Sequence, residues 1–166
     1  MKLKYFIPLF IFFPVVIIQL TIIPFISIQG VVPDLLLIAV VYFSISYGQI
    51  FGTITGASYG LLYDLISGNL IGSTMLSKTV AGFVAGYFSS ETRRDKYLYT
   101  YSFSLVVLIT GLIDALIFSF FSVIDFNTNI LQVLFNHALM PSIYTSVISI
   151  LVIIVPYKRT FLSENR

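Results

Sequence analysis

Long apolar stretches, separated by short polar segments, dominate this chain of 166 residues. Hydrophobic residues make up 58% of it and charged residues 10%, and the mean hydropathy is +1.00. A soluble domain has about 25% charged residues, so the composition argues strongly against a soluble fold. Because a membrane-crossing helix needs about 20 apolar residues, the chain has room for about six spans with short connections. We therefore predict an all-α integral membrane protein with six transmembrane helices.

The expected helices follow the apolar stretches and the turn residues between them. Pro33 suits the first position of the second helix, which places Asp34 at the positive end of the helix dipole. Bends are expected at Pro14, Pro24 and Pro141. The first apolar stretch is too long for the core of a signal peptide, so we expect a retained helix. The predicted spans are residues 5–28, 33–47, 50–67, 73–88, 98–122 and 132–155, in one domain covering residues 1–166.

The distribution of basic residues predicts the orientation. Six spans place both termini and the loop at residues 91–96 on one side of the membrane, and the positive-inside rule makes that side cytoplasmic. Arg93, Arg94 and Lys96 in this loop either contact anionic lipid or an acidic partner, or serve only as a topology anchor. Eight of the nine Lys and Arg residues lie on this side: Lys2, Lys4, Arg93, Arg94, Lys96, Lys158, Arg159 and Arg166.

Glycines recur at every fourth position in two stretches, Gly52-x3-Gly56-x3-Gly60 and Gly82-x3-Gly86. In lipid, small residues at this spacing let helix backbones approach closely. We expect them to serve packing inside the bundle, with a homodimer or partner interface as the alternative. The residues assigned to motifs and helix packing are Pro33, Asp34, Gly52, Gly56, Gly60, Asp64, Ser67, Gly68, Gly72, Gly82 and Gly86.

Ionisable side chains occur within or at the edge of the predicted spans, all in the outer half: Asp34, Asp64, Lys78, Asp114 and His137. A charge at a helix centre costs about 2.5–3.5 kcal/mol, so compensation is expected. Because Asp64 and Lys78 have similar predicted depths, we predict a buried ion pair between them, or a Lys78 that bridges Asp64 and Asp114. These charges fix helix register, form a proton, ion or ligand path, or recognise a partner. Asp34 is a helix cap or a functional residue, and His137 a hydrogen-bonded residue at a helix start or a ligand.

Several function classes lack support in the residues. The absence of cysteine excludes disulfides and thiolate chemistry. The glycine stretches do not match a phosphate loop, the single histidine gives no metal-ligand spacing, and no nucleophile and base are paired at helical spacing. We therefore predict a protein that is not an enzyme, with no cofactor, no metal and no nucleic-acid partner.

Two motifs and one glycine-spaced helix form a combined pattern in the first half of the chain. They read Val32-Pro33-Asp34-Leu-Leu-Leu, Gly56-x3-Gly60-Leu-Leu-x-Asp64-Leu-x-Ser67-Gly68-x3-Gly72, and Gly82-x3-Gly86 before a basic loop. This pattern resembles the MreD family of bacterial rod shape-determining membrane proteins. The resemblance implies a component of the cell-elongation machinery in the cytoplasmic membrane. The partners it implies are an MreC-like single-pass protein and, indirectly, the MreB filament system and the peptidoglycan synthases of the elongasome, together with membrane lipid.

The resemblance also supplies an alternative function. The MreD family is similar in fold to the substrate-binding S-components of energy-coupling-factor vitamin transporters. An S-component is expected to carry an Ala-x3-Ala patch on its first helix, whereas this chain has the bulky run Phe12-Phe13-Pro14-Val-Val-Ile-Ile-Gln19 there. This run disfavours transport. Gln19, the strongly polar residue of the span, is expected to hydrogen-bond another helix.

Overall fold

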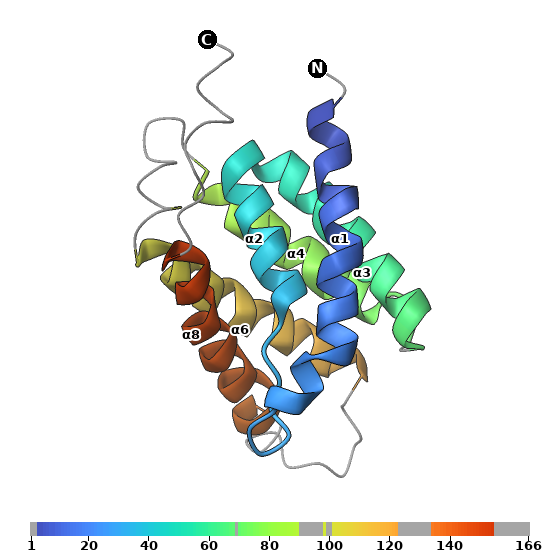
Figure 1. The fold of residues 1–166 in the computed structure, drawn as a ribbon, viewed down its shortest axis with the longest axis vertical. Coiled ribbons are helices and arrows are strands. Elements are labelled where there is room, and N and C mark those ends of the chain that lie inside the picture. Colours follow the sequence, from blue (N-terminus) through green and yellow to red (C-terminus); the bar gives the residue numbers. More distant parts are fainter. Residues whose placement is uncertain (1–2, 69, 90–97, 99–100, 123–133, 155–166) are drawn as a thin grey trace.

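The computed structural model describes residues 3–68, 70–89, 98, 101–122 and 134–154, and this part of the chain is helical (Figure 1). Its six α-helices are α1 (Leu3–Thr21), α2 (Leu35–Tyr47), α3 (Gln49–Ser67), α4 (Ser73–Tyr87), α6 (Ser102–Ser122) and α8 (Met140–Ile154). A 3-10 helix, η1 (Ile23–Ile26), follows α1, and a π-helix, η2 (Leu134–Leu139), precedes α8. Extended pairing in these residues is limited to one bridge between Ile28 and Val31. The predicted all-α fold is confirmed.

Within the described residues, one helix has both the length and the composition to cross a membrane. This stretch is Ser102–Phe121 in α6, with 20 residues. Shorter apolar stretches occur in three other helices, at Phe10–Thr21, Leu35–Tyr47 and Met140–Leu151. The observed helices fall in the same parts of the chain as the predicted spans, although several are shorter.

α2 is the central helix of the bundle. On one side it packs against α1 and α3, in a cluster that includes Phe12, Val40 and Tyr59. On the other side it packs against α4 and α6, in a cluster that includes Val41 and Phe103. A helix that is apolar on all sides belongs in the interior of a bundle. Figure 1 shows α2 between α1 and α8 in this view, with α4 behind it.

α3 and α4 pack antiparallel with their backbones in direct contact. A Cβ atom at Gly56 would lie 2.1 Å from the carbonyl oxygen of Lys78, and one at Gly82 would lie 2.3 Å from the carbonyl oxygen of Gly52. No side chain fits at such distances, so glycine is required where these helices cross. We call the five residues of this contact the glycine seam: Gly52, Gly56, Gly60, Gly82 and Gly86.

Two of the predicted spans are interrupted, both at prolines. The first was expected to run through residue 28, but α1 ends earlier and Pro24 lies in η1. Proline has no N–H to donate along an α-helix, and the chain then turns through Gln29 and Gly30, with φ of 52° and 81°. In the last span, Pro141 follows the junction of η2 and α8, where a wider π turn replaces the regular hydrogen-bond pattern.

Candidate functional site

Asp64 caps α4 from the end of α3. Its side chain accepts hydrogen bonds from the backbone N–H groups of Gly72 (2.9 Å), Thr74 (3.3 Å) and Met75 (3.2 Å). Gly72, the N-cap of α4, has no side chain to perform this role. Asp64 is only 1% exposed, so it satisfies backbone donors that would otherwise be buried without partners. The positive end of the α4 dipole also favours its negative charge.

The predicted ion pair between Asp64 and Lys78 is therefore replaced by a different arrangement. The glycine seam sets the register of α3 and α4, and it places Gly56 level with Lys78. Asp64 lies eight residues beyond Gly56, which is about 12 Å along the helix axis. The prediction that Asp64 and Lys78 lie at similar depths in the membrane did not take this register into account. The register brings Asp64 to the first turn of α4 instead.

Gly68 and Gly72 shape the turn between α3 and α4 and do not belong to the glycine seam. Their φ angles are +71° and +101°, and no atom lies within 4 Å of a Cβ built on either residue. Glycine is therefore needed for backbone conformation rather than for close packing. The N–H of Gly68 donates to the carbonyl of Asp64 at 3.1 Å and ends α3, while the Ser67 hydroxyl donates to the carbonyl of Tyr63 at 2.8 Å.

Asp34 is the N-cap of α2. Its carboxylate accepts a hydrogen bond from the N–H of Leu37 at 2.9 Å. The helix begins at Leu35, so Pro33 precedes the cap and does not occupy the predicted first helical position. This contact is the helix cap that was one of the two roles predicted for Asp34. The second carboxylate oxygen remains available to other partners.

Two neighbouring helices hold the start of α2 in place. Gln19 of α1 donates to the carbonyl of Pro33 at 3.0 Å and accepts from the N–H of Leu35 at 2.9 Å. Thr145 of α8 accepts from the N–H of Asp34 at 3.0 Å. The expected interhelical hydrogen bond of Gln19 is thus directed at backbone groups. These contacts fix the position from which the Asp34 side chain reaches inward.

Lys78 of α4 lies between two carboxylates, one from α2 and one from α6. Its Nζ is 2.5 Å from Asp34 Oδ2 and 2.7 Å from Asp114 Oδ2. Lys78 is 3% exposed and Asp114 is 7% exposed. We call Asp34, Lys78 and Asp114 the ion triad. One ammonium group faces two carboxylates, so the ion triad has a net charge of −1 when all three groups are ionised.

Two polar atoms beside Lys78 lack hydrogen-bond partners among the described residues: Asp114 Oδ1 and Thr74 Oγ1. The adjacent Ser77 hydroxyl donates to the carbonyl of Thr74 at 3.1 Å. Buried polar atoms nearly always have a partner, and each one left without a partner costs about 1–3 kcal/mol. The Ser77 hydroxyl also interacts with the Asp114 carboxylate, so Thr74 Oγ1 is the polar atom that the protein itself leaves unused at this site.

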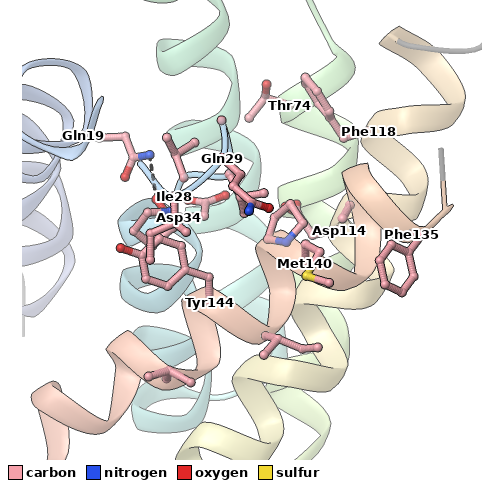
Figure 2. A pocket seen from close by; sticks show the side chains of 18 of the residues that line it. Gln19, Ile28, Gln29, Asp34, Thr74, Asp114, Phe118, Phe135, Met140 and Tyr144 are labelled. Atoms are coloured by element: carbon pink, nitrogen blue, oxygen red, sulfur yellow. Dashed lines mark hydrogen bonds between the residues drawn. The ribbon is translucent and has the colours of Figure 1, made fainter. Parts of the chain in front are cut away.

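A cavity of about 1070 Å³ opens beside the ion triad (Figure 2). We call it the triad pocket. The segment between η1 and α2 lines it, together with parts of α4, α6, η2 and α8. Its polar side chains include the ion triad and Thr74, and much of the remainder is apolar; the other polar side chains that line it are Gln19, Gln29, Tyr63 and Tyr144. An apolar cavity with a few convergent polar groups is the usual form of a small-molecule site.

Arg93, Arg94 and Lys96 lie outside the described residues, and so does the side chain of His137. In the part of the chain that is described, no group of three His, Cys, Asp or Glu side chains is placed to hold a metal ion. The chemistry available at the triad pocket is charge pairing and hydrogen bonding.

Sequence reasoning did not identify Thr145 or the unpaired hydroxyl of Thr74 as parts of the site. Thr74 lies one helical turn before Lys78, and this spacing puts both residues on one side of α4. This spacing is the signal in the sequence that points to Thr74. Nothing in the sequence connects Thr145 with Asp34, since 111 positions separate them.

These features define a helical bundle with a buried ion triad and an adjoining pocket, held together by a close glycine contact. The family model for the rod shape-determining protein MreD matches residues 1–162. The chain therefore belongs to the MreD family, as its motifs predicted, and the family indicates a role in rod-shape determination. No curated protein and no solved structure matches it, so the expected similarity to transporter S-components remains a prediction.

Proposed function

We propose that this chain is a multi-pass, non-enzymatic component of the cell-elongation machinery that binds an MreC-like single-pass protein and links it to peptidoglycan synthesis. The family match over residues 1–162 carries the proposal. The MreB filament system and the wall synthases would be reached through that partner. Contact would be lateral, between helices, because the predicted connections are too short for a folded domain outside the membrane.

The outward side of α3 supports lateral binding. Ile50 is 80% exposed and Ile54 is 61% exposed. Each lies two positions from a residue of the glycine seam, which is about 200° around the helix. An apolar face of this kind suits the lipid chains or another transmembrane helix. Since the seam glycines are occupied by contacts within the chain, we assign partner binding to the outward faces.

The proposed topology has six spans with both termini in the cytoplasm, and it can be tested by thiol labelling. The chain contains no cysteine, so a single introduced cysteine gives a signal without background. A membrane-impermeant maleimide should label Ser27→Cys in intact spheroplasts and Thr92→Cys only after permeabilisation. Labelling of both variants in intact spheroplasts would contradict the topology.

The partner is tested by affinity purification of the tagged full chain from native membranes in mild detergent, followed by mass spectrometry. Recovery of an MreC-like single-pass protein and wall synthases is expected. Recovery of paired ATPases with a transmembrane coupling subunit would overturn the proposal in favour of a transporter component.

Photo-crosslinking then locates the contact. A photoreactive amino acid is placed at exposed positions on separate helices, Ile54 of α3, Phe83 of α4 and Leu105 of α6, with buried Ala81 as the matched control. Crosslinks to the MreC-like protein from neighbouring outward positions, and none from Ala81, are expected. Equal crosslinking from every position would show non-specific proximity only.

A further inference from the structure

We propose that the triad pocket binds a primary ammonium group carried on an apolar chain, such as the aminoethyl headgroup of a membrane phospholipid. This function goes beyond shape determination and does not depend on the protein partner proposed above. It follows from three properties of the triad pocket: its charge, its unpaired acceptors and its apolar wall.

The charge of the ion triad favours a cation. The single ammonium of Lys78 is already bonded to Asp34 and Asp114, which leaves one negative charge uncompensated when all three groups are ionised. The Asp34 side chain is 30% exposed, so a ligand in the triad pocket can reach it. An anionic group placed at the ion triad itself would meet two carboxylates and an ammonium group already paired with both. A second ammonium group would instead neutralise the site.

The unpaired acceptors favour a ligand that donates hydrogen bonds. Thr74 Oγ1 has no partner among the described residues, and the one hydroxyl facing the Asp114 carboxylate, that of Ser77, also donates to the carbonyl of Thr74; both Thr74 and Asp114 line the triad pocket. Both residues are more than nine-tenths buried. A primary ammonium has three N–H donors on one small group. Figure 2 shows Thr74 and Asp114 in the wall of the triad pocket, on the side of Phe118.

The apolar wall favours a ligand with a hydrocarbon chain. Phe118 of α6 and Ile143 and Val147 of α8 line the triad pocket. Ile143 is 47% exposed and Val147 is 57% exposed, so this wall continues onto the outer surface of α8. A small free amine would leave this wall without a contact. An amphiphile fills both parts, with its headgroup at the ion triad and its chain along α8.

Native mass spectrometry of the full chain in detergent tests the proposal. The added probes are phosphatidylethanolamine and phosphatidylcholine with the same acyl chains. Phosphatidylcholine has the same phosphate and positive charge but no N–H donor. Because charge-assisted hydrogen bonds are the stronger kind, phosphatidylethanolamine should bind about tenfold more tightly. Equal binding of the two lipids overturns the proposal, and it is also the outcome expected if a basic segment of a partner protein is the occupant.

A matched pair of variants assigns the binding to the triad pocket. Thr74→Val removes the unpaired hydroxyl with little change of shape and should reduce the lipid preference about threefold, the effect of losing one modest hydrogen bond. Thr110→Val is the control, because Thr110 is fully buried in α6, bonds the carbonyl of Val106 and does not line the triad pocket. Thr110→Val should keep about the wild-type unfolding temperature, and Thr74→Val should keep or raise it, because it removes a buried hydroxyl that has no partner. An unchanged preference in Thr74→Val, or an equal loss in Thr110→Val, contradicts the assignment.

A competition experiment separates the headgroup amine from the rest of the lipid. Dodecylamine should displace phosphatidylethanolamine, whereas dodecyltrimethylammonium, which has no N–H, should not. If neither compound displaces phosphatidylethanolamine, the site does not recognise an ammonium group. An experimental structure with phosphatidylethanolamine present, in which only water contacts Asp114 Oδ1 and Thr74 Oγ1, also overturns the proposal.

Discussion

The glycine seam and the ion triad stabilise the same helix, α4, in opposite ways. At the seam, side chains are absent and the backbones of α3 and α4 touch. At the triad, long charged side chains reach across from α4 to α2 and α6. Lys78 belongs to both regions, because its carbonyl oxygen lies against Gly56 and its ammonium lies between Asp34 and Asp114.

The difference shows how the molecule divides two tasks. The seam has no room for a side chain, so it fixes how α4 lies along α3. The triad adjoins a cavity of about 1070 Å³ and contains unpaired acceptors, so it has room for an additional group. We infer that the rigid contact positions Lys78 and that the open region carries the binding.

The largest effect is expected when the shared residue loses its charge. Lys78→Met leaves two carboxylates together in a buried site, and breaking a buried ion pair in this way costs about 3–5 kcal/mol. A denaturant titration of the purified chain in detergent measures the loss of unfolding free energy. The control is Lys78→Met combined with Asp34→Asn and Asp114→Asn, which removes the repulsion and should restore part of the stability. Wild-type stability in the single variant would show that the ion triad does not contribute to the fold.

A smaller but clear effect is expected at the seam. Gly56→Ala adds a Cβ atom 2.1 Å from the carbonyl oxygen of Lys78. Backbone atoms cannot move aside as a side chain can, so α3 and α4 must separate, at a cost of about 1–3 kcal/mol. The separation also displaces Lys78, so the lipid preference of the triad pocket should fall together with the stability. Loss of stability without any change in lipid preference would show that the two regions are independent.

The sequence predicted the helical class and the close helix packing at the glycines, because both follow from local composition and from the spacing of residues along the chain. It also identified Lys78 and Asp114 as residues needing compensation, since buried charge is rare in apolar stretches. The pairing of Lys78 with Asp34 was not predicted, because it depends on how α2 lies against α4. The role of Asp64 was missed for a related reason: only the register of the glycine seam brings it to the first turn of α4.

An intermediate effect is expected at the α4 cap, which links the two regions along the chain. Asp64→Asn keeps one acceptor oxygen but loses the second one and the negative charge. Because Asp64 accepts from three backbone N–H groups, the substitution should destabilise the chain by about 1 kcal/mol, as the loss of a cap does. Hydrogen exchange should accelerate at the start of α4 and not at its end. Faster exchange along the whole helix would mean that Asp64 supports the bundle generally.

The smallest effect is expected at Gly111 of α6, which lies outside the seam and serves as its comparison. A Cβ atom there would lie 3.3 Å from Leu37 Cδ2 and 3.4 Å from the Ser142 side chain. Both neighbours are side-chain atoms that can shift by a few tenths of an ångström, and alanine has the higher helix propensity by about 1 kcal/mol. These terms nearly cancel, so Gly111→Ala should change the unfolding free energy by less than about 0.5 kcal/mol, the usual range for tolerated sites. A loss equal to that of Gly56→Ala would show that close helix approach is general in this bundle and not confined to the seam.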